Sequence, residues 1–260
     1  MNKKQWEIFC SFRQEFKEKI EEWSKRCPTL ASLQEAAAKT AATPPYPLET
    51  PVVYNRDLDK IGPEDEIRLI VIGDNPGKDE QLVKNNRYLV GQAGKIAEGY
   101  FRRNPVLQVD FRKNVIILNK TPVHSAKTNQ LKYLIKNGGE EVKALLEESQ
   151  LWMAEKTGRL HIDLLNACGP SSFKPELWLV GYGELRNKKL FVSYRDKLQE
   201  VYKDYLEQWQ KVFLFQHFSM NRFTIDLDDF IKKENLSLEP DHLLENLQKL
   251  GICHRKELFN

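Results

Sequence analysis

Four short apolar runs place the strongest limit on how this chain can fold. They span residues 67–72, 115–118, 177–180 and 212–215. Runs of this length between polar or turn residues are typical of buried strands. Helix-period stretches lie between them, at residues 93–103, 140–156 and 194–210. Because strands that alternate with helices form parallel sheets, we predict an α/β fold, a three-layer α/β/α sandwich around a central, mainly parallel four-stranded sheet.

Further helices are expected towards both ends of the chain. Apolar residues at helical spacing predict an amphipathic helix over residues 5–27, and residues 31–39 continue the helical pattern. The prolines between residues 44 and 51 predict an extended linker, because proline offers no backbone donor to a helix or sheet. We expect Gly158 to end the long middle helix, and a last helix to follow Pro240. The chain then divides into an N-terminal helical extension, 1–43, packed on a single α/β domain, 44–260.

Composition excludes several classes of protein. With 41% hydrophobic and 10% aromatic residues, a chain of 260 residues can build a sizeable core, which excludes disorder as its main state. No apolar run approaches the roughly 20 residues that a membrane-spanning helix needs. The charged N-terminal stretch does not resemble a secretory signal. We therefore expect a cytoplasmic protein without a membrane partner.

No metal or cofactor is expected from the residues alone. The four cysteines form no C-x-x-C pair, and the histidines have no second ligand at metal-binding spacing. The chain also lacks the Walker A string and a G-x-G-x-x-G turn after its first predicted strand. These absences disfavour zinc, iron–sulfur and nucleotide cofactors.

The positive charge is concentrated in one stretch. The whole chain carries 40 Lys and Arg against 37 Asp and Glu, a formal charge of +3, yet residues 78–136 hold 12 basic and four acidic side chains, 12 − 4 = +8. Such a local excess suits a face that binds a polyanion such as a nucleic acid. The alternative is a solvated surface that is basic without binding anything.

Polar side chains follow the predicted strands where ligands bind in parallel sheets. Asn75 lies in the turn after the first strand, Asn119 ends the second, and His217 follows the fourth. The carboxyl ends of parallel strands meet at one sheet edge, so we expect these three side chains to face a common pocket. An amide offers both a donor and an acceptor, and a histidine ring can do either near neutral pH.

Four motifs in this order resemble those of the uracil-DNA glycosylase superfamily, over roughly residues 44–223. They are Gly73-Asp-Asn-Pro-Gly77, Leu89-Val-Gly-Gln-Ala-Gly-Lys95, Val115-Ile-Ile-Leu-Asn119 and His217-Phe-Ser219. The first is similar to the mismatch-specific and single-strand-selective branches, and the second to the thermophile-type branch that carries an iron–sulfur cluster. Ser24 stands where Cys27 would need a partner for that cluster, so we expect no cofactor.

The resemblance implies a monofunctional DNA glycosylase of base-excision repair. It would flip uracil, or a related deaminated base, out of the DNA and hydrolyse its N-glycosidic bond. Three residues would be catalytic: Asn75, His217 and Asp74. Three would recognise the base: Asn119, Tyr88 and Leu89. Contacts with DNA would come from Pro76, Gly77, Ser219, Met220, Asn221, Arg222 and Lys120.

Two other functions stay open at this point. One is a nucleic-acid-binding protein of the same fold without catalysis, and the other is an enzyme or binder that uses the same pocket for a small molecule. In the leading hypothesis the partner is DNA that contains a deaminated base, and we expect the protein to be a monomer.

Overall fold

A four-stranded, entirely parallel sheet forms the centre of the computed structural model, which describes residues 1–170 and 172–259. Its strands are β1 (Leu69–Gly73), β2 (Val115–Asn119), β3 (Glu176–Val180) and β4 (Val212–Phe215). They lie in the order β2-β1-β3-β4, so that β1 and β3 are central and β2 and β4 are the edges. The predicted strands are confirmed, with β4 matching the predicted run at both ends.

Every residue of the four strands is buried, and successive side chains enter opposite cores. In β1, Ile70 and Ile72 belong to one hydrophobic cluster, and Leu69 and Val71 belong to the other. The sheet is therefore apolar on both faces, as the unbroken hydrophobic runs predicted.

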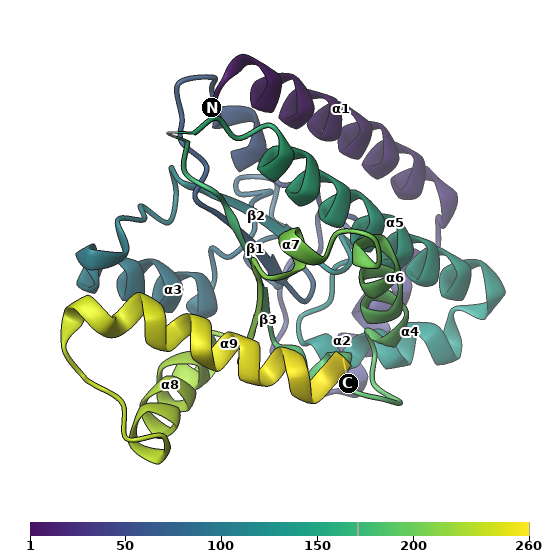
Figure 1. The fold of residues 1–260 in the computed structure, drawn as a ribbon. Coiled ribbons are helices and arrows are strands. Elements are labelled where there is room, and N and C mark those ends of the chain that lie inside the picture. Colours follow the sequence, from purple (N-terminus) through teal and green to yellow (C-terminus); the bar gives the residue numbers. More distant parts are fainter. Residues whose placement is uncertain (171, 260) are drawn as a thin grey trace.

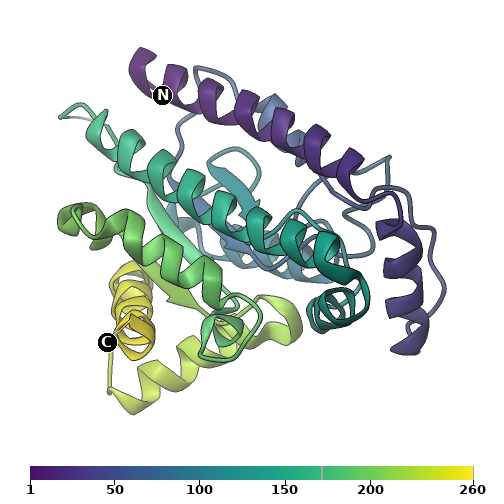
Figure 2. The ribbon, with the colours of Figure 1, turned by 90° about the vertical axis from the view of Figure 1, so that its right-hand side faces the viewer.

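Helices cover both faces and complete the three-layer sandwich (Figures 1 and 2). The first face is covered by α1 (Lys3–Arg26), α2 (Leu30–Thr40), α4 (Leu131–Asn137), α5 (Gly139–Asn166) and α6 (Val192–Tyr202). The second face is covered by α3 (Gln92–Arg103), α8 (Arg222–Lys233) and α9 (Leu243–Phe259). The short helix α7 (Leu206–Trp209) leads into β4. The predicted fold class is confirmed.

The N-terminal helix α1 is an integral part of the first layer. Asn2 and Gln5 form a capping box that satisfies backbone donors at the start of the helix. Phe9, Phe16 and Trp23 are fully buried in the same cluster as the sheet residues, and α1 runs along α5 (Figures 1 and 2). The predicted extension thus contributes to the core of the α/β domain.

Three predicted helices differ from those observed. The long middle helix does not end at Gly158, because α5 continues to Asn166. A Cβ at Gly158 would lie 2.8 Å from Val201, so this glycine permits close contact between α5 and α6. The predicted helix over 194–210 is divided into α6 and α7, and the last helix extends beyond residue 250 to Phe259. Neither α4 nor α8 was predicted.

None of the helices in the described part of the chain combines the length and apolar character required to span a membrane.

Candidate active site

A cavity of about 600 Å³ lies at the carboxyl edge of the sheet. Asp74 and Asn75 enter it from the turn after β1, Asn119 from the end of β2, and His217 from the segment after β4. The structure therefore brings together the three polar side chains that the strand pattern placed at one edge.

The predicted site residues fall into two groups. The cavity is lined by Asp74, Asn75, Gly77, Leu89, Asn119, His217 and Ser219. The remaining ones lie outside its lining: Pro76, Tyr88, Lys120, Met220, Asn221 and Arg222. Pro76, Tyr88 and Lys120 are buried behind the cavity wall, whereas Met220, Asn221 and Arg222 are exposed beside it.

The side chain of Asn75 is held in place by hydrogen bonds from its amide nitrogen. Its Nδ2 donates to the hydroxyl of Ser125 at 2.9 Å, to the carbonyl of Ser125 at 3.2 Å and to the carbonyl of Pro76 at 3.1 Å. These bonds fix the side chain. Its Oδ1 is buried and has no partner, so Asn75 carries an unsatisfied acceptor in the wall of the cavity.

Asn119 presents the complementary group. It is only 2% exposed, and its Nδ2 is buried without a partner. Its Oδ1 lies against Gly73, where a Cβ would come within 2.4 Å of that oxygen. Glycine is therefore required at position 73 for the Asn119 amide to take this place. An unsatisfied donor in a buried position costs about 1–3 kcal/mol, so the arrangement favours a ligand that accepts this hydrogen bond.

His217 has a defined tautomer. The amide and hydroxyl of Ser219 lie 3.1 and 2.8 Å from Nδ1, and because the amide can only donate, Nδ1 must be the acceptor. The proton of the neutral ring is then on Nε2. Burial lowers the pKa of His217, Asp74 opposes this effect and Lys120 adds to it. His217 is therefore a neutral Nε2–H donor near pH 7.

Asp74 is paired with a fully buried lysine. Lys120 Nζ lies 2.6 Å from Asp74 Oδ1 and also donates to the carbonyl of Val180 at 2.7 Å. This placement differs from the predicted contact of Lys120 with DNA, because a buried ammonium cannot reach a phosphate backbone. Asp74 keeps its second oxygen, Oδ2, 3.4 Å from the hydroxyl of Thr128.

The two residues expected to cover a base behave differently. Tyr88 is fully buried, and its hydroxyl donates to the carbonyl of Val53 at 2.6 Å, so it belongs to the core and does not face the cavity. Leu89 does line the cavity, with a positive φ of 50° that is unusual for a branched residue. Arg112 donates to the carbonyls of both residues and holds this conformation.

The sequence analysis did not single out several residues in or next to the cavity, of which three matter most for its geometry. They are Glu80, His124 and Ser125. His124 Nδ1 donates to the carbonyl of Pro76 at 2.9 Å, while its Nε2 accepts from the hydroxyl of Tyr46 at 2.9 Å. The Ser125 amide also donates to the Pro76 carbonyl. Their one sequence signal is position, because His124 and Ser125 follow β2 by a few residues.

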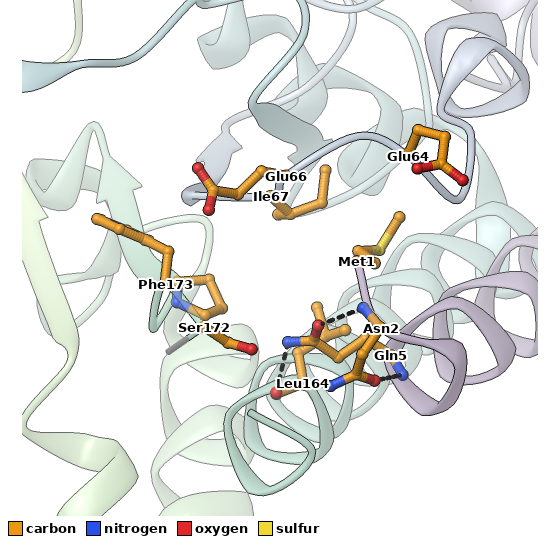
Figure 3. A pocket seen from close by; sticks show the side chains of 10 residues that line it. Met1, Asn2, Gln5, Glu64, Glu66, Ile67, Leu164, Ser172 and Phe173 are labelled. Carbon is orange, nitrogen blue, oxygen red and sulfur yellow. Dashed lines mark hydrogen bonds between the residues drawn. The ribbon is translucent and has the colours of Figure 1, made fainter. Parts of the chain in front are cut away.

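A second cavity, of about 300 Å³, lies at the opposite edge of the sheet (Figure 3). Glu66 and Ile67 precede β1 and Pro175 precedes β3, so its walls come from the amino ends of the strands. Asn2 and Gln5 are hydrogen-bonded to each other there (Figure 3). Among the residues that the structure describes, none lining this cavity has a buried polar side-chain atom without a partner. The carboxyl edge is therefore the better candidate site.

Within residues 1–170 and 172–259, no group of three or more His, Cys, Asp and Glu side chains is arranged to hold a metal ion. Comparisons of the chain with protein-family models, curated proteins and solved structures give no match. The function must therefore be inferred from the chemistry of the cavity.

Proposed function

We propose that this protein is a DNA glycosylase that removes uracil or a related deaminated base from DNA. The observation that carries the proposal is the set of free polar groups in one cavity: the Asn75 acceptor, the Asn119 donor and the His217 Nε2–H. These groups complement a base that has carbonyl oxygens on its edge and a water that must be oriented for attack. The motif resemblance supports the same function.

Asn119 would read the edge of the base. Its free Nδ2 donates to the O4 carbonyl of uracil, and its Oδ1 accepts from N3–H. Cytosine presents an amino group where uracil has O4, so the Asn119 donor would face another donor. Deamination of cytosine would thus convert a rejected base into an accepted one.

Asn75 would orient the attacking water. Its Oδ1 accepts one hydrogen of the water while Ser125 fixes its Nδ2. A carboxamide does not take up a proton, so the water attacks C1′ only after the glycosidic bond has largely broken and its electron pair has moved to the base. The proton that the water then loses neutralises the departed base anion. The Asp74 carboxylate, which also lines the cavity, would stabilise the oxocarbenium-like sugar at that stage.

His217 would stabilise the departing base. Loss of the base leaves negative charge on its O2 oxygen, and an Nε2–H donor fixed by Ser219 can bind that oxygen. The interaction strengthens as the charge develops, so it lowers the barrier and contributes little to ground-state binding.

The surface around the cavity suits a DNA backbone. Lys78 and Lys127 line its mouth and are exposed. Next to Ser219, Met220 is 76% exposed, and both Met220 and Asn221 have positive φ values, of 55° and 57°. An exposed apolar side chain at this place can enter the gap that a flipped nucleotide leaves in the duplex.

The test is release of a base from oligonucleotides that contain uracil, hypoxanthine or xanthine, followed by alkaline cleavage at abasic sites. We expect strand breaks with at least one of these substrates. Asn75→Ala and His217→Ala should each lower the single-turnover rate by at least about 10²-fold. The exposed residues Asn137 and His242 supply matched controls, and their alanine variants should react like the wild type. Lack of any break at enzyme excess would overturn the proposal.

One observation favours a second candidate, a nucleic-acid-binding protein without catalysis. In the described chain, the cavity lining contains no Phe, Tyr or Trp that could stack on a base. Stacking contributes roughly 1–3 kcal/mol per base, and Leu89 replaces it only in part. This candidate predicts salt-sensitive DNA affinity without product. A protein that uses the cavity for a small molecule would show no DNA affinity at low salt.

A further inference from the structure

Glu80 is a buried carboxyl group in the wall of the cavity. Only 7% of the surface of Glu80 is exposed. Its Oε2 accepts a hydrogen bond from the Gly77 amide at 3.2 Å, and its own amide donates to the Gly77 carbonyl at 3.2 Å. The side chain thus braces the turn that carries Asn75. The reaction outlined above does not use Glu80, and a buried carboxyl group is costly unless it is hydrogen-bonded or paired.

Glu80 is also tied to the part of the cavity wall formed by Leu89, here called the Leu89 wall: the amide of Arg87, two residues before Leu89, donates to the Glu80 carbonyl at 3.3 Å. The amides of Gly77 and Leu89 both stabilise the ionised form of the Glu80 side chain. Leu89 has the strained φ of 50°, Arg112 binds its carbonyl, and a Cβ at Gly94 would lie 1.6 Å from that carbonyl. Strained backbone persists only where surrounding contacts enforce it. Glu80 therefore supplies the contact on the amide side of Leu89, and Arg112 supplies the one on its carbonyl side.

We propose that Glu80 is a positioning residue whose carboxylate fastens the Asn75 turn to the Leu89 wall, and so sets the width of the cavity for a flipped base. The inference rests on the proposed glycosylase function. Asn75 lies on one side of this link and the apolar surface expected to cover the base lies on the other. Displacement of either by about 1 Å would misplace the water relative to the sugar and cost about 10²-fold in rate.

The link depends on the charge of Glu80. Burial raises its pKa to about 7, while the two amides and Arg112 oppose this effect and Asp79 adds to it. The neighbouring hydroxyl of Tyr88 stays protonated, because burial raises its pKa well above the ordinary value. Above about pH 7 the carboxylate can accept from both amides. Below it the protonated group loses acceptor capacity, so the Leu89 wall should loosen as the pH falls.

The first experiment compares pH profiles of uracil release for the wild type, Glu80→Gln, Glu80→Asp and Glu176→Gln. Glu176 is a matched control, because it is also 7% exposed but accepts from Trp178 and Gln248 at the start of β3. We expect the wild-type kcat/KM to rise through about pH 7. Glu80→Gln should lower it by about 10- to 100-fold and remove the rise, Glu80→Asp should lower it and keep the rise, and Glu176→Gln should keep the wild-type profile. A rise that survives in Glu80→Gln would overturn the proposal.

The second experiment does not depend on activity. Hydrogen exchange of the segment 86–92, corrected for intrinsic rates, reports how firmly the Leu89 wall is held. We expect about tenfold faster exchange in Glu80→Gln than in wild type or Glu176→Gln, and weaker protection of the wild type below pH 7. If Glu80→Gln does not fold, this wild-type pH dependence decides. Equal protection under all these conditions would overturn the role of Glu80. If no substrate releases a base, the proposed function fails and this measurement still tests the link.

Discussion

Lys120 Nζ lies 2.6 Å from Asp74 Oδ1, at the end of a side chain with no exposed surface. The carbonyls of Val180 and Gly73 take the remaining donors of the ammonium, at 2.7 and 3.4 Å. The pair thus connects the ends of β1, β2 and β3 beneath the cavity. Such a pair is costly to break, because the remaining charge has no solvent to stabilise it.

Loss of Lys120 should therefore destabilise the whole domain. We expect Lys120→Met to lower the free energy of unfolding by about 3–5 kcal/mol, as for one partner of a buried pair. Lys127→Met is the matched control at an exposed lysine of the same cavity, and should change it by less than about 0.5 kcal/mol. Urea unfolding at pH 7 measures both. A loss below about 1 kcal/mol in Lys120→Met would contradict the buried pair.

Protonation of His124 should couple stability to pH. Burial lowers the pKa of His124 to about 4, from 6.5 in the unfolded chain. Between these values the unfolded state binds the extra proton, so this histidine makes the folded state less stable as the pH falls from about 6.5 to 4. The slope is about 1.4 kcal/mol per pH unit.

Comparison with His124→Asn isolates this effect, since asparagine keeps a donor near Nδ1 for the Pro76 carbonyl but does not titrate. His161, with a pKa of about 4, adds a slope of the same sign, and Glu80 adds one of opposite sign. Both persist in the variant. Urea unfolding should therefore show that the wild type loses about 1.4 kcal/mol of unfolding free energy relative to the variant for each unit by which the pH falls. A constant difference from pH 4 to 6.5 would contradict a neutral, buried His124.

Gly94 should be intolerant of any side chain. A Cβ there would lie 1.6 Å from the Leu89 carbonyl, so Gly94→Ala must displace the Leu89 wall. We expect a loss of about 1–3 kcal/mol in unfolding free energy, together with a lower rate of base release. Gly99→Ala in the same helix meets only the flexible end of Arg103 at 3.0 Å, and should range from neutral to about 1 kcal/mol more stable. Equal stability of the two variants would argue against the close approach.

The lysines at the mouth of the cavity should govern the salt dependence of DNA binding. Replacing Lys78 and Lys127 with Gln should reduce the slope of log K against log salt by about 1.8, if each neutralises one duplex phosphate. The matched control replaces Lys3 and Lys4, exposed at the start of α1 beside the cavity at the amino edge. It should keep the wild-type slope, measured by fluorescence anisotropy. An unchanged slope in the Lys78 and Lys127 variant would mean that these lysines do not contact DNA phosphates.

The sheet could be predicted from sequence because each strand is an unbroken apolar run that is buried on both faces. Helix ends were harder to predict. Glycine often ends a helix, but Gly158 lies inside α5 and leaves room for Val201. This role depends on the packing of α5 on α6, which the local sequence does not show. The helix α8, which was not predicted, begins at Arg222 directly after the His217 loop.

The cavity was partly predictable for a similar reason. Asn75, Asn119 and His217 are placed by the carboxyl ends of parallel strands, so topology alone brings them together. Tyr88 and Leu89 are adjacent in sequence, and no pattern distinguishes the one that enters the core from the one that lines the cavity. The partners of Lys120 and Glu80 depend on three-dimensional contacts, so their burial could not be predicted from charge or spacing.

The strand that precedes His217, β4, is an edge strand, and within the described residues it pairs only with β3. Asn75 and Asn119, in contrast, follow the adjacent strands β1 and β2. Local unfolding of β4, or loss of its contacts with the helix α9, would move the His217 ring out of the cavity while Asn75 and Asn119 keep their places. Under the proposed function, the protein would then bind a flipped nucleotide without cleaving its glycosidic bond, which offers a way to trap the complex for structure determination.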